Sequence, residues 1–213
     1  MQPLAHRAIV RAAVARLGDR LAPLLPMLLR GSDDEDVHLV PWLGIRVQAV
    51  GLTHTHRPGG RFGELFAPSA KARCVALVAD ARRRAPRDPE GAAHRYGRAC
   101  HLLVDVSVPA RSRGVWHFYG DPLEAWVEAH VDELDSLPEA GLPATSDPGE
   151  LCESLARLSS SFAADTTRST WGDLRMRVLG RGVRVTEEDA RSQARVLVPA
   201  AMAHVAALLH ELA

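Results

Sequence analysis

Apolar residues recur at helical spacing along most of this chain, and this periodicity constrains the fold more than any other feature. In residues 4–17 arginines occupy one helical face, and the opposite face carries Ile9, Val10, Ala13, Val14 and Leu17. Comparable patterns predict helices over 21–29, 69–84, 88–106, from 121, over 150–164 and from 186 to about 212. The sequence therefore predicts an all-α fold, with one compact domain of about seven helices over residues 1–213.

Capping residues and breakers support these boundaries. Asp121-Pro122-Leu123-Glu124 combines an N-cap, a proline at the first helical position and an acid three residues after the cap. Thr186 and the three acids that follow it start the last helix. Gly31 is predicted to cap the C-terminus of the second helix. Residues 31–68, which are rich in Gly, Pro and His, are predicted to form a long loop region, and 138–149 a turn-rich connection.

Composition excludes several classes of protein. The 213 residues carry 26 Lys plus Arg and 26 Asp plus Glu, so the net charge is zero, which argues against bulk nucleic-acid binding through a basic surface. A hydrophobic share of 46% excludes a disordered chain. The three cysteines are widely spaced and form no CxxC pair, so neither a disulfide framework nor a thiolate zinc site is indicated.

The apolar segments are short. No uninterrupted apolar run approaches the roughly 18 residues of a membrane-spanning helix. The N-terminal segment is interrupted by Arg7, Arg11 and Arg16, so it lacks the apolar stretch of a secretion signal. We therefore expect a cytoplasmic protein.

The strongest chemical pattern is His101-Leu-Leu-Val-Asp105. The i, i+4 spacing places an imidazole and a carboxylate on the same face of a helix, where both can bind one metal ion. The apolar residues around them predict a dry environment, in which a carboxylate needs an opposite charge. A divalent cation or an arginine could supply that charge, and the pattern taken alone is more typical of a structural His–Asp pair without a metal.

Two other segments carry candidate histidines. His54 and His56 lie two residues apart in the loop region, so both could converge on one site, one alone could face inwards, or both could lie at the surface. His6 lies on the apolar face of the first helix. A histidine there is more often a satisfied core residue than a metal ligand.

Acidic residues near these histidines are also candidates. Residues 33–36 form the run DDED, which is typical of solvated surface unless one carboxylate turns inwards to a metal. His117 precedes the helix that begins at Asp121, and Glu124 lies in the first turn of that helix. Glu124 is explained equally well as part of the helix cap.

The order of these elements resembles that of the zinc-dependent phospholipase C and single-strand nuclease family. The resemblance covers residues 6 to about 130 and rests on His6, GSDDED at 31–36, HTHRP at 54–58, HLLVDVSVPA at 101–110 and Glu124-Ala-Trp-Val. It implies an all-helical fold that holds a zinc cluster in a cleft. It also implies one zinc ion bound by four residues: Asp36, His54, His101 and Asp105.

The resemblance implies a second zinc ion bound by His6 and by Asp105, which bridges the two metals. In the family the amine and carbonyl of the N-terminal residue also bind this ion, and here Met1 stands five residues before His6. A free terminal amine at Met1 could therefore reach the site.

The positions that match a third zinc site depart from the family pattern. Arg111 and Gly120 stand where the family has histidines, and His117 is a candidate substitute. His117 and Glu124 are then two ligands where the family has three. Because a guanidinium does not bind metals, we expect two zinc ions and assign Arg111 to contact with a phosphate or carboxylate.

These residues predict a metal-dependent phosphoester hydrolase that acts on a phosphodiester or phosphomonoester through a zinc-activated water. Asp36 is a candidate general base as well as a ligand, and Arg111 is the candidate phosphate contact. The expected partner is a small-molecule or other soluble phosphoester substrate. Two alternatives remain open. One is a repurposed metal enzyme, such as a Lewis-acid cyclase or isomerase of secondary metabolism, and the other is a non-catalytic helical binding protein.

Overall fold

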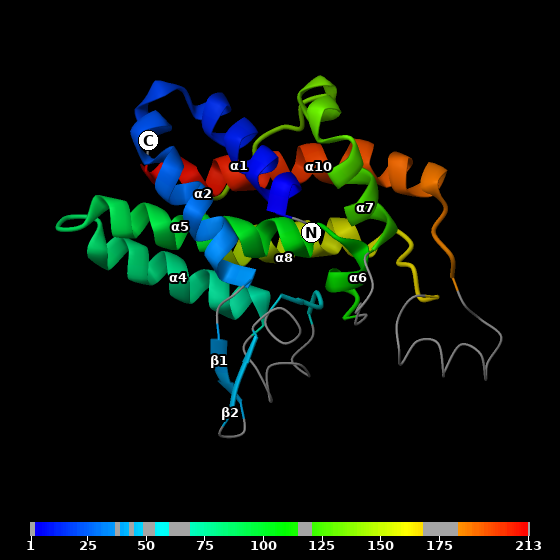
Figure 1. The fold of residues 1–213 in the computed structure, drawn as a ribbon, viewed down its shortest axis with the longest axis horizontal. Coiled ribbons are helices and arrows are strands. Elements are labelled where there is room, and N and C mark those ends of the chain that lie inside the picture. The colour runs from blue at the N-terminus through cyan, green and yellow to red at the C-terminus, as the bar shows by residue number, and fades with distance from the viewer. Residues whose placement is uncertain are drawn as a thin grey trace.

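The computed structural model describes residues 3–36, 39–42, 45–48, 54–59, 69–114, 121–167 and 183–212. Within these ranges the chain forms α-helices, short 3₁₀ helices and one antiparallel hairpin (Figure 1). The α-helices are α1 (Pro3–Leu17), α2 (Leu25–Asp36), α4 (Ala70–Arg84), α5 (Pro89–Val106), α6 (Pro109–Ser112), α7 (Pro122–Ala129), α8 (Pro148–Ser160) and α10 (Glu187–Leu209). The 3₁₀ helices are η1 (Asp19–Leu24), η2 (Val131–Ser136) and η3 (His210–Leu212), and the hairpin pairs β1 (Leu39–Trp42) with β2 (Ile45–Gln48). The all-α prediction is confirmed, and the described residues hold eight α-helices where about seven were predicted.

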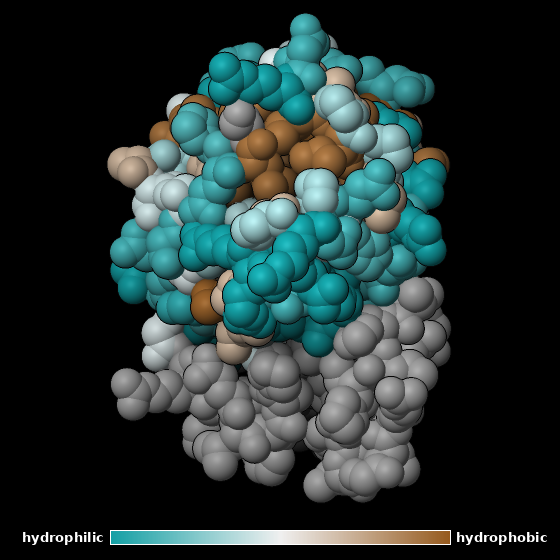
Figure 2. Space-filling view, turned by 90° about the vertical axis from the view of Figure 1, so that its left-hand side faces the viewer, coloured by the Kyte–Doolittle hydropathy of each residue, from teal (hydrophilic) through white to brown (hydrophobic). Residues whose placement is uncertain are grey.

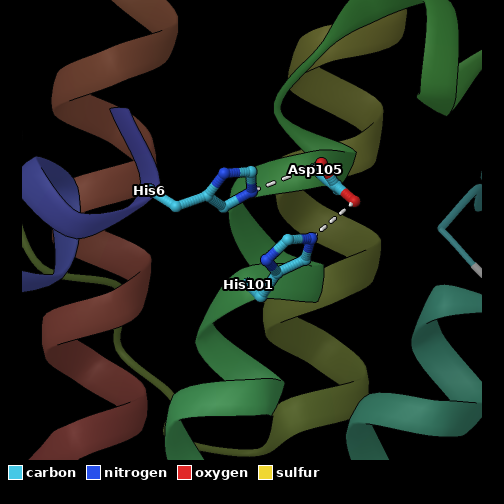
Figure 3. A group of neighbouring side chains, drawn as sticks. All are labelled: His6, His101 and Asp105. Carbon is cyan, nitrogen blue, oxygen red and sulfur yellow. Dashed lines mark ion pairs between the residues drawn. The ribbon is translucent and has the colours of Figure 1, made fainter. Parts of the chain in front are cut away.

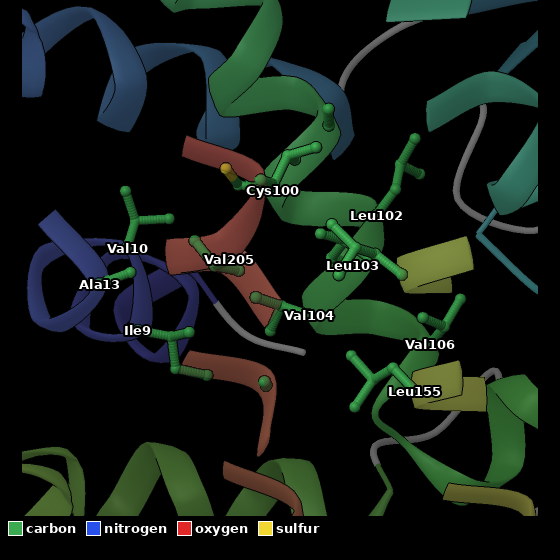
Figure 4. Close-up of a cluster of buried hydrophobic side chains, with 14 of the residues drawn as sticks. Ile9, Val10, Ala13, Cys100, Leu102, Leu103, Val104, Val106, Leu155 and Val205 are labelled. Carbon is green, nitrogen blue, oxygen red and sulfur yellow. The ribbon is translucent and has the colours of Figure 1, made fainter. Parts of the chain in front are cut away.

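Helix α5 lies at the centre of the fold. Every residue from Tyr96 to Val106 is buried, and the helix packs against α1, α2, α4, α8 and α10 (Figure 1). Other helices therefore cover this length of α5 on all sides, and burial of each large apolar side chain contributes about 2 kcal/mol. Figure 4 shows part of this core, which includes Ile9, Leu102, Leu103, Val104, Leu155 and Val205. His101 and Asp105 therefore lie inside the core, because they belong to the buried length of α5.

Local capping sets the helix starts near the predicted positions. Ser69 caps α4 and Asp88 caps α5, each through a side-chain oxygen that accepts from a backbone N–H of the first turn. Asp121 caps α7 in the same way, and Thr186 and Asp189 form a reciprocal capping box at α10. The predicted starts at 69, 88, 121 and 186 are confirmed to within one residue.

The prediction that Gly31 ends the second helix is wrong, because α2 runs through Gly31 to Asp36. A Cβ on Gly31 would lie 2.0 Å from the carbonyl oxygen of His94 on α5, and a Cβ on Gly97 would lie 2.0 Å from that of Leu28. The two glycines therefore allow the backbones of α2 and α5 to approach closely. Residues 31–36 of the predicted loop region are therefore helical, and residues 39–42 and 45–48 of that region form the paired strands β1 and β2.

The surface contrasts with this core. On the face in Figure 2, one hydrophobic area is surrounded by hydrophilic side chains. By length and composition, the segment Glu187–Leu212 could cross a membrane. However, 72% of its most apolar window is buried in the structure, as expected for a core helix.

Candidate metal centre

The carboxylate of Asp105 is fully buried, and side chains from three other segments of the chain meet there. Its oxygens lie 3.4 Å from Nε2 of His6 on α1 and 3.4 Å from Nε2 of His101 on α5 (Figure 3). They also lie 2.6 Å from Nδ1 of His54 in the segment 54–59 and 3.5 Å from Nε of Arg111 on α6. Residues that are more than a hundred positions apart in the sequence, such as His6 and Arg111, thus share one carboxylate.

Asp36, the last residue of α2, extends this cluster. Its Oδ1 lies 3.3 Å from Nε2 of His101 and 3.9 Å from Nδ1 of His54. Two groups of three residues could each hold a metal ion, because the potential ligand atoms within each group lie within 4.8 Å of one another. One group is His6, His101 and Asp105, and the other is Asp36, His54 and His101. The structure therefore brings together all five residues that the family resemblance assigns to the first two zinc ions.

A hydrogen bond to a backbone carbonyl and stacking against another ring fix the orientation of the His101 side chain. Its Nδ1–H donates to the carbonyl oxygen of Ser32 at 2.8 Å, which directs Nε2 towards Asp36 and Asp105. The ring of His6 stacks on it, with centroids 3.9 Å apart and planes inclined by 7°. A backbone carbonyl on one ring nitrogen is the usual means of presenting the other nitrogen to a metal.

The charges of the cluster favour a cation. Burial lowers the pKa of His101, but Asp105 and Asp36 outweigh it and raise this pKa to about 9. Burial, together with the neighbouring His101, lowers the pKa of His6 to about 4. Burial would raise the pKa of Asp105, yet the surrounding positive charges, Arg111 among them, hold it well below its usual value. Near neutral pH, His101 therefore keeps its proton between ionised carboxylates, and a divalent ion that replaced this proton would balance the same negative charge.

Of the two histidines in HTHRP, only His54 faces this cluster. His56 instead lies 2.9 Å from Glu153 on α8, through its Nε2. The N–H of Gly59 donates to the same carboxylate at 3.1 Å, and the N–H of His56 donates to the carbonyl of Arg111 at 3.3 Å. His56 therefore anchors the segment that positions His54.

The acidic run DDED is not simple solvated surface. Asp33 pairs with Arg7, and Asp34 lies 2.9 Å from Nε2 of His94. Glu35 is fully buried, and its ion-pair partners are Arg73 of α4 and Arg98 of α5.

Glu35 is a residue that the sequence analysis missed. Nε of Arg98 donates to it at 2.7 Å and Nη2 of Arg73 at 3.1 Å. Burial would raise the pKa of Glu35, but these two guanidinium groups hold it below its usual value. Arg98 lies in the predicted core helix close to several apolar residues and is itself buried, so the presence of an arginine there was the available signal for a buried acidic partner.

The residues of the predicted third site do not form a metal cluster among the residues described. Nε and Nη2 of Arg111 each lie 3.3 Å from Oε1 of Glu124. Burial would raise the pKa of Glu124, but positive charge that includes Arg111 lowers it to about 2. His117 and Gly120, like Met1, lie outside the described residues. Arg111 thus links the carboxylate of Glu124 to that of Asp105.

Comparison with known proteins supports the fold. No protein-family model and no curated protein matches the chain. Among solved structures, the alpha toxin of Clostridium absonum matches 98% of this chain with a TM-score of 0.64 at 14% identity. The alpha-toxin of an avian strain of Clostridium perfringens matches 99% of it with a TM-score of 0.59, also at 14% identity. This likeness shows a shared fold. The chain spans 63% and 61% of these two proteins, which is less than two thirds of their length.

Proposed function

We propose that this protein is a metal-dependent hydrolase of phosphoesters that binds two zinc ions. One observation carries the proposal: His6, His54 and His101 converge on the buried carboxylate of Asp105, and Asp36 faces two of these histidines. The order of these motifs resembles that of the zinc-dependent phospholipase C and single-strand nuclease family. The fold shared with two alpha toxins is consistent with that resemblance.

The side chains fit zinc. Imidazole nitrogens and carboxylate oxygens are its usual ligands, at about 2.0–2.2 Å. Nε2 of His101, which faces Asp36 and Asp105, is buried and has no hydrogen-bond partner among the described residues. A buried nitrogen of this kind is costly unless something binds it. When bound, zinc supplies a nucleophilic water at neutral pH and an electrophilic clamp on phosphate oxygens.

The exposure of its side chain to solvent distinguishes Asp36 from the other residues of the cluster. The side chain of Asp36 is 31% exposed, whereas those of His6, His54, His101 and Asp105 are at most 1% exposed. Asp36 is therefore the cluster member that solvent and substrate can reach, and we assign it as ligand and candidate general base. Its pKa lies below the usual value: burial opposes this, and the neighbouring His101 outweighs burial.

Arg111 is assigned to the substrate phosphate. Its pKa is raised because Asp105 and Glu124 outweigh the effect of burial, so the guanidinium keeps its charge. Its side chain is 18% exposed, and a guanidinium has five N–H donors, so it can bind a phosphate oxygen while it stays paired with carboxylates. The pairing with Glu124 supports a count of two zinc ions instead of three.

The wider assignments belong to the same proposal. We infer a single domain over residues 1–213, a soluble phosphoester as the substrate and a cytoplasmic location. The burial of the most apolar helix in the core supports a soluble protein.

The Arg111–Glu124 pair also favours a second candidate function. A site that keeps two zinc ions but places a guanidinium in the third position could act on a carboxylate or phosphate of another substrate class. A Lewis-acid cyclase or isomerase is the corresponding reaction type.

Zinc content and hydrolysis together test the proposal. Elemental analysis of protein purified without a histidine tag should give about two zinc ions per chain, and added zinc should support hydrolysis of an aryl phosphodiester. His101→Gln should reduce both, because it removes a nitrogen that faces Asp36 and Asp105. His94→Gln is the matched control, since His94 lies on the same helix and pairs with Asp34 away from the cluster. Wild-type protein that binds no zinc would refute the proposal, and zinc binding without hydrolysis would favour the second candidate.

A further inference from the structure

Glu35 lies directly behind His54, on the side away from Asp105. Oε1 of Glu35 lies 3.8 Å from Nε2 of His54, whereas Nδ1 of the same ring lies 2.6 Å from Asp105. Both residues are fully buried. The imidazole of His54 is thus held between a carboxylate of the candidate metal centre and a carboxylate outside it.

A neutral imidazole carries one proton, and its position depends on whether a metal is bound. Nδ1 is the nitrogen that faces Asp36 and Asp105, so it is the atom available to a metal in that cluster. Binding through Nδ1 uses its lone pair and leaves the proton on Nε2. In the metal-bound protein, the donor Nε2–H therefore points to the side where Glu35 lies.

We propose that Glu35 is a positioning residue that accepts the Nε2–H of His54 and so holds the tautomer that presents Nδ1 to zinc. This inference rests on the proposed function, because it concerns the same two-zinc centre. The separation of 3.8 Å exceeds a hydrogen bond of about 2.9 Å by less than 1 Å, so a small displacement of one side chain closes it. A carboxylate that accepts from a ligating histidine is a common arrangement at zinc sites.

Arg73 and Arg98 prepare Glu35 for this role. They approach it from α4 and α5 and hold its carboxylate in a fixed orientation, with their donors on both oxygens. Because guanidinium groups only donate hydrogen bonds, the carboxylate of Glu35 acts as an acceptor towards both arginines. Because these pairs also join three helices, an experiment must separate positioning from stabilisation of the fold.

Nitrogen-15 NMR of the histidine rings makes that separation. In wild-type protein titrated with zinc, we expect the His54 ring to carry its proton on Nε2 and to lose the Nδ1–H signature of the metal-free state. Zinc-loaded wild-type protein that keeps the proton on Nδ1 overturns the inference, whatever the variants do.

Zinc affinity of variants, measured by competition with a chromophoric chelator, provides the second arm. Glu35→Gln should weaken zinc binding by about 10- to 100-fold. Arg73→Gln removes one of the same buried ion pairs but leaves the acceptor, so it should lower thermal stability with a smaller change in affinity. Asp34→Asn makes the same change of charge on the same helix, away from His54, and should leave affinity unchanged.

The outcomes distinguish this inference from the proposed function. Wild-type protein that binds no zinc refutes the function itself. Zinc binding that Glu35→Gln leaves unchanged, or that Glu35→Gln and Arg73→Gln weaken equally, refutes the positioning role alone.

Discussion

Replacing Asp105 with asparagine removes one buried negative charge while it keeps the size and shape of the side chain. In the metal-free protein this carboxylate lies 3.4–3.5 Å from Nε2 of His101 and Nε of Arg111. Loss of one partner from a buried ion pair costs about 3–5 kcal/mol. Both cations keep another carboxylate at 3.3 Å, namely Asp36 for His101 and Glu124 for Arg111. We therefore expect the lower end of that range, about 3 kcal/mol of the free energy of unfolding.

Thermal unfolding in the presence of a chelator measures this loss. For a chain of this length, about 3 kcal/mol corresponds to a Tm lowered by about 6–12 °C. With zinc present the difference should be larger, because Asp105 is assigned to both metal positions and bound ligand stabilises the folded state. Elemental analysis should show that Asp105→Asn empties more than one zinc position.

Asp80→Asn is the matched control for this substitution. Asp80 accepts from Arg83, Arg84 and Arg95, but it lies at the surface, where such pairs contribute about 1 kcal/mol or less. If Asp105→Asn shifts the metal-free Tm no more than this control does and keeps the wild-type zinc content, the bridging role is wrong.

Three further predictions concern the protonation of His101, the burial of Asp121 and the close helix contact at Gly31. Although burial lowers the pKa of His101, neighbouring carboxylates raise it to about 9, so zinc binding near neutral pH should release a proton. Calorimetry in buffers of different ionisation enthalpy measures this release, and a buffer-independent heat would contradict it. Burial raises the pKa of Asp121 from 3.8 to about 6, so its ionisation costs stability as pH rises through 6. Asp121→Asn should then add about 3 kcal/mol in urea unfolding above pH 7 and little near pH 4; equal gains at both would refute the assignment. Gly31→Ala should lose about 1–3 kcal/mol or more, because its Cβ would lie 2.0 Å from the carbonyl oxygen of His94. Gly141→Ala, with nothing within 4 Å of the added Cβ, is its control in the same melts.

The parts of the fold that depend on local chemistry could be predicted from the sequence. Helix starts at Ser69, Asp88 and Thr186 follow from a capping side chain and the residues just after it, so no distant contact is needed to locate them. Gly31 satisfies the same kind of local rule, but the prediction failed there. Its role is set by the carbonyl of His94 on another helix, and the sequence pattern near Gly31 does not contain that information.

In the candidate metal centre, too, some features follow from local sequence and others depend on contacts between distant segments. The i, i+4 spacing of His101 and Asp105 indicates a shared face without any knowledge of the fold. The approach of His54 to Asp105 could be expected only from the order of motifs in a known family. Glu35 was missed because an acidic run is ordinarily solvated, and what buries Glu35 is its pairing with two arginines on other helices.

The register of α2 against α5 decides which acid of the run DDED faces the candidate metal centre. Successive residues on a helix point about 100° apart, so Glu35 faces Arg73 and Arg98 while Asp36 faces His101. If α2 were rotated by one residue, the carboxylate that faces His101 would be that of Glu35, which is paired here with two arginines, and not that of Asp36. The close contact at Gly31 fixes that register, since any side chain there would push α2 away from α5. Gly31→Ala should therefore lower zinc affinity as well as stability, and a variant that lost stability but bound zinc as tightly as wild type would show that the register does not depend on this contact.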